Sequence, residues 1–168
     1  MIDNIDLRIV KELQRNGRKS YLDLAKMVGV VEGTIRKRMK RLRDQGIIRV
    51  IAAPNLLELG YNLIAIIGFQ VKMEDLRKVT DDLAQNKHVC YLCWVTGRYD
   101  LMAIIVTRSP KELSYIMEKE ISTIPSILRT EIFVSLDVIK GTWGLIDTTQ
   151  LIDNLDDSSA VIGDHFAR

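Results

Sequence analysis

The 168-residue chain has few of the residues that mark secreted, disordered or membrane-spanning proteins. Two cysteines are too few for a disulfide framework, and three prolines with ten glycines are too few for a low-complexity chain. The longest apolar run, Leu63 to Phe69, is far below the ~20 residues that cross a bilayer. The N-terminus is acidic from Asp3 onward, unlike the basic start of a signal peptide. We expect a soluble, cytoplasmic protein with no membrane partner.

The sequence also lacks the motifs of the common enzyme classes. It contains no P-loop, no GxGxxG and no Ser-His-Asp spacing, and its two histidines, His88 and His165, are too few for a histidine-based site. Cys90 and Cys93 have CxxC spacing. Residues three apart on a strand point to opposite faces, so we expect two separate thiols there and no shared metal. The sequence therefore predicts no enzyme, no cofactor and no metal.

The net charge of +2 is unevenly distributed along the chain. Residues 1–51 hold 13 Lys and Arg against 6 Asp and Glu, a net charge of +7, whereas residues 52–168 have a net charge of −5. A uniformly basic coat protein is excluded by the total. The asymmetry instead indicates two modules with different partners, of which the basic one is the candidate for nucleic acid.

The basic segment, residues 1–53, has the pattern of three short helices followed by a strand. Apolar residues recur at helical spacing, and Gly29 provides a tight turn between the second and third helices. We expect helices over about residues 5–13, 20–28 and 32–45. Residues 47–51 are rich in β-branched side chains and predict a strand, either a wing or part of a linker over 47–60. This layout predicts a winged helix-turn-helix domain.

From residue 61 the pattern changes to alternating strands and helices. We expect strands over residues 63–72, 89–95, 101–106 and 127–139, and helices over residues 74–86 and from Pro110 to Pro125. This βαββαβ order predicts a ferredoxin-like domain over residues 61–141, and an α+β chain overall. Residues 142–168 form an acidic tail of unassigned role.

The third expected helix presents a basic face. On a helical wheel Ile35, Met39 and Leu42 fall together and face inward. The outer side carries Gly33, Thr34, Lys37, Lys40 and Arg41, with Arg36 and Arg43 on one flank and Arg38 on the other. The residues that we expect to contact DNA are Gly33, Thr34, Arg36, Lys37, Arg38, Lys40 and Arg41. A basic helix face is often simply solvated, but two preceding helices and a glycine turn favour a recognition helix in the major groove of double-stranded DNA.

Short motifs in a fixed order give the chain a family resemblance over about residues 3–141. The motifs are Arg18, Leu24-Ala25, Val28-Gly29-Val30, Thr34 to Leu42, Gly46-Ile47-Ile48, Leu59-Gly60-Tyr61, Thr96 to Leu101, Ile124-Pro125 and Arg129-Thr130-Glu131. Together they resemble the Lrp/AsnC family of prokaryotic transcriptional regulators. The chain departs from this pattern at Val31, where the family has Ser or Thr, and at Ser126, where it has glycine.

The resemblance implies both an architecture and partners. It implies a winged helix-turn-helix joined to a ferredoxin-like effector domain, with homodimers formed through the sheets and often assembled into octamers. It also implies an amino acid bound between dimers as the effector, and a roughly palindromic operator. Other functions remain open at this point. Sirohaem decarboxylases resemble the same architecture, and a ligand-independent architectural DNA-binding protein would carry the same basic helix.

The loop from Thr96 to Asp100 is the candidate effector site. Gly97 can adopt positive φ and expose backbone N–H groups to a carboxylate, and Asp100 can pair with an ammonium group. An exposed hairpin turn is the alternative. The expected effector-binding residues are Gly97, Arg98, Tyr99, Asp100, Thr130 and Ser135. Ile132 stands where the family often has a second polar residue, which leaves open an effector with an apolar side chain, or none.

Overall fold

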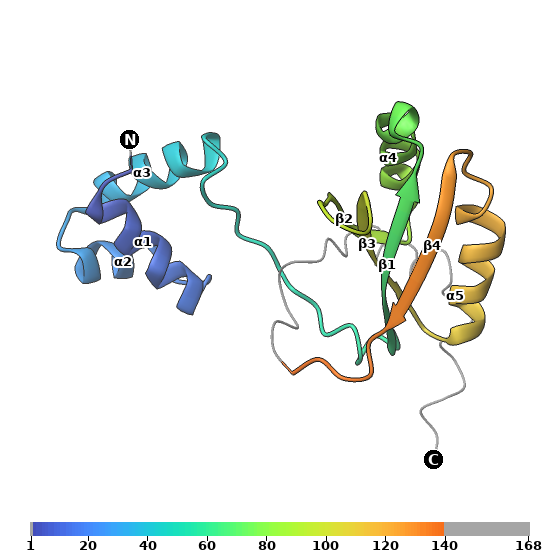
Figure 1. Ribbon diagram of the computed structural model, residues 1–168. Helices are drawn as coiled ribbons and strands as arrows, with labels where there is room; N and C mark the ends of the chain where they lie inside the picture. Colours follow the sequence, from blue (N-terminus) through green and yellow to red (C-terminus); the bar gives the residue numbers. More distant parts are fainter. Residues whose placement is uncertain (1, 140–168) are drawn as a thin grey trace, which may run out of the picture. The chain divides into compact units, whose positions relative to one another are not determined.

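The computed structural model describes residues 2–139, which form two compact units divided between Ala52 and Ala53 (Figure 1). No helix in this part of the chain is long and apolar enough to cross a membrane. The acidic tail expected over residues 142–168 lies outside the described residues.

The first unit is a three-helix bundle, as the sequence predicts. Its helices are α1 (Asn4–Arg15), α2 (Tyr21–Val28) and α3 (Glu32–Asp44). Ile9, Leu24, Ile35 and Leu42 are fully buried between them. The helices begin and end where local chemistry dictates. Asp3 forms a capping box at the start of α1, the Ser20 side chain caps α2, and Gly29 ends α2 in the left-handed conformation at φ 82°.

The strand expected over residues 47–51 is not formed. Ile47 and Ile48 both donate their backbone N–H groups to the carbonyl of Leu42 and so close the end of α3 instead. A strand needs a partner for its ladder, and the described residues of the first unit contain no other strand. Val50 is exposed, so β-branched composition alone did not establish a wing here.

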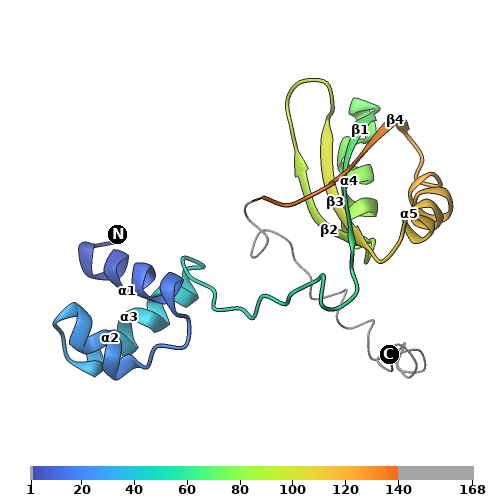
Figure 2. The same cartoon turned by 90° about the horizontal axis from the view of Figure 1, so that it is seen from below.

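The second unit is a four-stranded antiparallel sheet with two helices on one face (Figures 1 and 2). Its strands are β1 (Leu63–Val71), β2 (Val89–Trp94), β3 (Leu101–Thr107) and β4 (Ile127–Val134), in the order β2-β3-β1-β4. Its helices are α4 (Leu76–Gln85) and α5 (Pro110–Ile116), with short turns over Met73–Asp75 and Met117–Ile121. The predicted βαββαβ order and α+β class are confirmed.

Helices cover one face of this sheet, and the other face is partly exposed. Ala65, Ile67 and Phe69 of β1 are fully buried beneath the helices. The alternate residues of β1 point to the other face, which we call the open face, and there Ile66 of β1 and Phe133 of β4 stay exposed. The open face thus presents apolar side chains that the described residues leave partly uncovered.

Strand β4 ends at Val134 rather than at the expected residue 139. It pairs only with β1, and its last bond to that strand runs from Ser135 N–H to the carbonyl of Ile64, the second residue of β1. At its other end Ser126 has a φ of 71°, the left-handed conformation that favours glycine. The Ser126 hydroxyl donates to the Asp75 carboxylate, which helps to hold the turn.

The expectation for Cys90 and Cys93 was wrong in its geometry. The β2–β3 register shifts between Val89 and Tyr91, which is a bulge. Cys90 therefore packs with Val106 on the open face, and Cys93 pairs with Met102 on that same face. Neither cysteine forms a disulfide, and the described residues contain no group of three or more side chains placed to hold a metal.

Candidate nucleic-acid interface and effector loop

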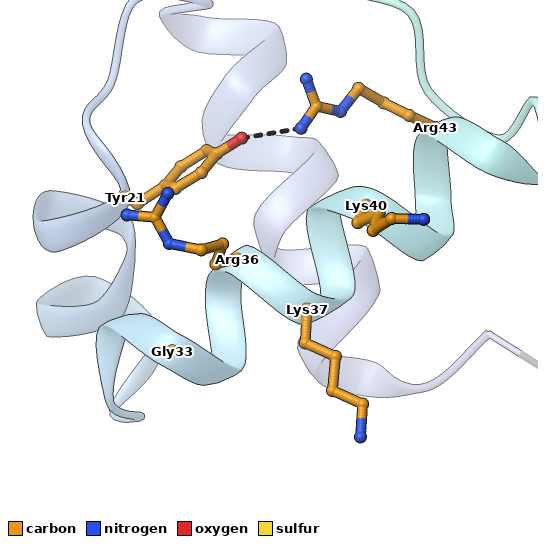
Figure 3. A pocket seen from close by; sticks show the side chains of 6 residues that line it. All are labelled: Tyr21, Gly33, Arg36, Lys37, Lys40 and Arg43. Atoms are coloured by element: carbon orange, nitrogen blue, oxygen red, sulfur yellow. Dashed lines mark hydrogen bonds between the residues drawn. The ribbon is translucent and has the colours of Figure 1, made fainter.

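A shallow basic depression lies on the outer surface of α3, at the side nearest the start of α2 (Figure 3). Its lining residues are Tyr21, Gly33, Arg36, Lys37, Lys40 and Arg43. Because residues 36, 40 and 43 are spaced by three and four, their side chains leave one side of the helix. The depression is therefore a surface on which four cations and one aromatic ring converge, and such surfaces attract polyanions.

The cations of this depression differ in how firmly they are held. Arg43 Nη2 donates to the Tyr21 hydroxyl over 2.9 Å, and the Arg36 guanidinium lies 5.4 Å from the centre of the same ring. Lys40 is 2.8 Å from the Asp44 carboxylate, and both side chains are exposed. Lys37 has no hydrogen-bond or ion-pair partner among the described residues, and Figure 3 shows its ammonium group pointing away from the helices. Lys37 is thus the cation most available to an external anion.

Two of the expected DNA-contacting cations are instead bound by carboxylates of the first helix. Asp6 is fully buried, and its oxygens accept from Arg38 Nη1 over 2.8 Å and from Arg41 Nη2. Arg38 also contacts Asp3 over 2.7 Å. We call these four residues the Asp6 cluster. Its guanidinium groups hold α3 against α1, so part of their charge is neutralised within the protein.

The ionisation of the Asp6 cluster agrees with this geometry. The hydrogen bond from Arg38 lowers the pKa of Asp3 to about 2. Burial opposes ionisation of Asp6, but hydrogen bonds from the Asp3 backbone and from Arg38 outweigh it and lower the pKa of Asp6 as well. The hydrogen bonds that Arg38 donates to Asp3 and Asp6 raise the pKa of Arg38. Asp3, Asp6 and Arg38 are therefore charged at neutral pH.

Helix α3 begins at Glu32 without a side-chain cap. Val31 makes no side-chain cap bond, as the sequence indicates. Gly33 is exposed with nothing within 4 Å of an added Cβ, and Thr34 is half-buried. Both lie in the first turn of the helix, where a recognition helix contacts base edges. Two lining residues, Tyr21 and Arg43, were not among the expected DNA contacts. The only signal for Tyr21 in the sequence was its place in the first turn of α2. Arg43 lies on the same flank of the helical wheel as Arg36, which was expected.

The loop from Thr96 to Asp100, the candidate effector loop, is fastened by Asp100 to β1, an inner strand of the sheet. The Asp100 N–H donates to the Phe69 carbonyl and its carboxylate Oδ2 accepts from Val71 N–H, both over 2.9 Å. Gly97 is exposed and has a φ of 121°, the conformation that the sequence predicts. One oxygen of Asp100 is thus committed to β1, and the other has no hydrogen bond among the described residues.

Tyr99 carries the loop across the open face. Its ring lies on Gly68, where an added Cβ would come within 2.7 Å of the ring, so only glycine fits beneath it. The Tyr99 hydroxyl donates to the Glu131 carboxylate, and this bond raises the pKa of Tyr99. Arg98 Nη2 lies 3.5 Å from the same carboxylate. The loop therefore brings a cation and a phenol to the Glu131 carboxylate, while the Asp100 carboxylate is bound to β1.

The structure does not bring every expected effector residue to this loop. Thr130 pairs with Phe69 and so faces the helix-covered side of the sheet, whereas its neighbour Glu131 faces Tyr99. Ser135 follows the end of β4, and its hydroxyl donates to the Asp137 carbonyl. Glu131 is the residue that sequence reasoning missed. Its place beside Thr130 was visible, but which of the two faced the loop depended on the β1–β4 register.

Comparison with known proteins matches both units separately. An AsnC-type helix-turn-helix domain model matches residues 2–43, and an Lrp/AsnC ligand binding domain model matches residues 64–144. An uncharacterized HTH-type transcriptional regulator of Pyrococcus furiosus is 35% identical over 145 residues, which cover 86% of this chain and 97% of that protein. The HTH-type transcriptional regulator Ptr1 of Methanocaldococcus jannaschii is 30% identical over 141 residues, covering 83% and 95%.

Solved structures share the same architecture. The structure of E. coli AsnC superposes with a TM-score of 0.79 at 29% identity, covering 84% of this chain and 96% of that one. A transcriptional regulator of Neisseria meningitidis, solved as a complex with L-Met, superposes with a TM-score of 0.77 at 21% identity, covering 90% and 99%. The second likeness bears on the fold alone.

Proposed function

Because the chain belongs to the Lrp/AsnC family of DNA-binding transcriptional regulators, we propose that its ligand-binding unit senses a free α-amino acid. The observation that carries this proposal is the chemistry gathered at the loop from Thr96 to Asp100. An α-amino acid presents an ammonium and a carboxylate on adjacent atoms, so its site needs groups of both signs close together. Asp100 and Glu131 supply negative charge for the ammonium group. Arg98 supplies positive charge for the carboxylate, and the exposed backbone at Gly97 supplies N–H donors.

The side chain of the effector is proposed to be apolar. The open face next to the loop supports this, because Ile66 and Phe133 expose apolar side chains there, whereas Ile132 pairs with Ile67 and faces the helices. The regulator of Neisseria meningitidis named above was solved with L-Met, which shows that one protein of this fold holds an apolar amino acid. Effector binding changes DNA occupancy only if the two assembly states bind it with different affinity.

Calorimetric titration of the full chain with single amino acids tests this proposal. We expect one apolar α-amino acid to bind, and Asp100→Asn to weaken its binding at least tenfold, because the amide can still accept from Val71 N–H but carries no charge. Glu118→Gln removes an exposed carboxylate elsewhere in the unit and is the matched control. Unchanged affinity in Asp100→Asn would exclude the loop, and no binding by any amino acid would exclude this effector class.

We propose further that the protein acts as a homodimer, assembling to octamers, on a roughly palindromic operator. The exposed apolar residues Ile66, Tyr91 and Phe133 of the open face support burial against a second copy. A two-fold symmetric pair of helix-turn-helix units reads two inverted half-sites about one helical turn of DNA apart. The role is regulatory rather than enzymatic, in keeping with the relatives named above.

Selection of operators from random DNA, with sedimentation of the complex, tests this assembly. We expect the enriched sequences to contain two inverted half-sites spaced by about 10 base pairs or a multiple, bound by an even number of chains. A single asymmetric site would contradict the symmetric dimer. Binding without enrichment over random competitor would favour the architectural alternative, and a spectral change on incubation with sirohaem would favour the enzyme.

A further inference from the structure

We propose that Tyr21 and Arg43 form a binding site for a single backbone phosphate of the DNA, a role that rests on the proposed DNA-contacting role of α3. The two side chains come from different helices, α2 and α3, and meet through the 2.9 Å hydrogen bond between them (Figure 3). Phosphate contacts of this kind fix the orientation of a protein on the duplex without reading its sequence.

The tyrosine is a fixed donor. Its ring packs against the core of the first unit, and the Arg36 guanidinium lies over it at 5.4 Å. Ring packing leaves the hydroxyl at the edge of the basic depression. A donor held in place before binding loses little conformational freedom when a phosphate arrives, unlike the side chain of Lys37.

The direction of the Tyr21–Arg43 bond leaves both groups able to donate again. Arg43 is the donor, so the tyrosine oxygen accepts and keeps its own proton. No described residue accepts that proton, and the Arg43 side chain has further N–H groups beyond those bound to Tyr21 and to the Met39 carbonyl. One neutral O–H and one charged N–H therefore lie next to each other, as two oxygens of one phosphate require.

The charges around Arg43 favour the same assignment. Arg38 and Arg41 are paired with the carboxylates of the Asp6 cluster, whereas Arg43 has no carboxylate partner among the described residues. The nearest acids of the depression are engaged elsewhere, Glu32 with Arg36 and Asp44 with Lys40. An incoming phosphate thus meets a full positive charge at Arg43.

The substitution Tyr21→Phe in the full chain isolates the hydroxyl, because the ring and its packing stay. We expect roughly tenfold weaker operator binding, since a hydrogen bond to a charged group is lost. The slope of log affinity against log salt should not change, because a neutral donor releases no counterion. Arg43→Gln removes a charge from the same site and should lower that slope by about 1 per half-site. Operator affinity equal to wild type in Tyr21→Phe would overturn the proposal.

Operators with one phosphate replaced by methylphosphonate show whether the contact is local. At one position per half-site, wild-type binding should fall and Tyr21→Phe should cause no further loss, whereas at other positions the two losses should add. Additive losses at every position would mean that the tyrosine acts only through the fold, and would overturn the proposal. If the wild-type protein selects no operator, the proposed symmetric recognition is contradicted and the phosphate site is not. The variant is then compared on non-specific duplex, where the phosphate site still predicts weaker binding.

Discussion

Full-length protein carrying Lys37→Ala and Lys40→Ala is expected to bind its operator roughly 30-fold more weakly per half-site at ~0.15 M salt. Both side chains line the basic depression, and Lys37 has no intramolecular partner among the described residues. Each phosphate that a lysine neutralises contributes about 0.9 to the salt slope, so the slope should fall by about 2 per half-site. Titrations monitored by fluorescence anisotropy at several salt concentrations measure both quantities.

The matched control removes the same charge from the other unit. Lys111 and Lys119 are exposed residues outside the basic face, and Lys119 already contacts Glu118. Substituting both by alanine should leave operator affinity and salt slope close to wild type. If the control pair weakened binding as much as the α3 pair, net charge rather than this helix face would govern the interaction, and the assignment of α3 would be wrong.

Much of the fold followed from local chemistry that the sequence displays. The apolar spacing of Ile9, Ile35 and Leu42, together with the turn at Gly29, predicted the first unit because helices and their caps depend on neighbours along the chain. The βαββαβ order was predicted in the same way. The conformation of residues 47–51 was predicted wrongly. β-branched residues indicate only a preference for strand, and whether a strand forms depends on a partner elsewhere in the structure.

The candidate site was predictable to the level of a helix face but not of individual contacts. The wheel placed the cations of α3 outward, yet Arg38 and Arg41 meet Asp6, which is more than 30 residues away along the chain. No local rule links those positions. The effector loop shows the same limit, since only the β1–β4 register decides that Glu131 faces the loop and Thr130 does not.

Substituting Asp6 by alanine is expected to remove about 2–3 kcal/mol from the free energy of unfolding of the first unit. The carboxylate is fully buried, and Arg38 and Arg41 lose their shared partner while their side chains are only 20% and 41% exposed. Removing one member of a buried ion pair costs more than the pair itself contributes, because charge is left uncompensated. Here Arg41 loses its carboxylate partner, while Arg38 keeps its contact with Asp3. Hydrogen exchange of amides in α1 and α3 of the full chain measures this loss where it arises.

Two comparisons separate the Asp6 cluster from ordinary surface charge. Glu32→Ala breaks an exposed pair with Arg36 and should change the same opening free energy by no more than about 0.5 kcal/mol.

The second test measures the stability of wild type and Asp6→Ala as the pH is lowered. The folded-state pKa values of Asp3 and Asp6 are lowered, so their stabilisation is complete above the usual value of 3.8 and is lost as pH falls toward about 2. Asp6→Ala should therefore lose less stability than wild type over that window. An equal loss in both proteins would show that acid unfolding proceeds through other groups, and that the cluster does not fasten α3 to α1.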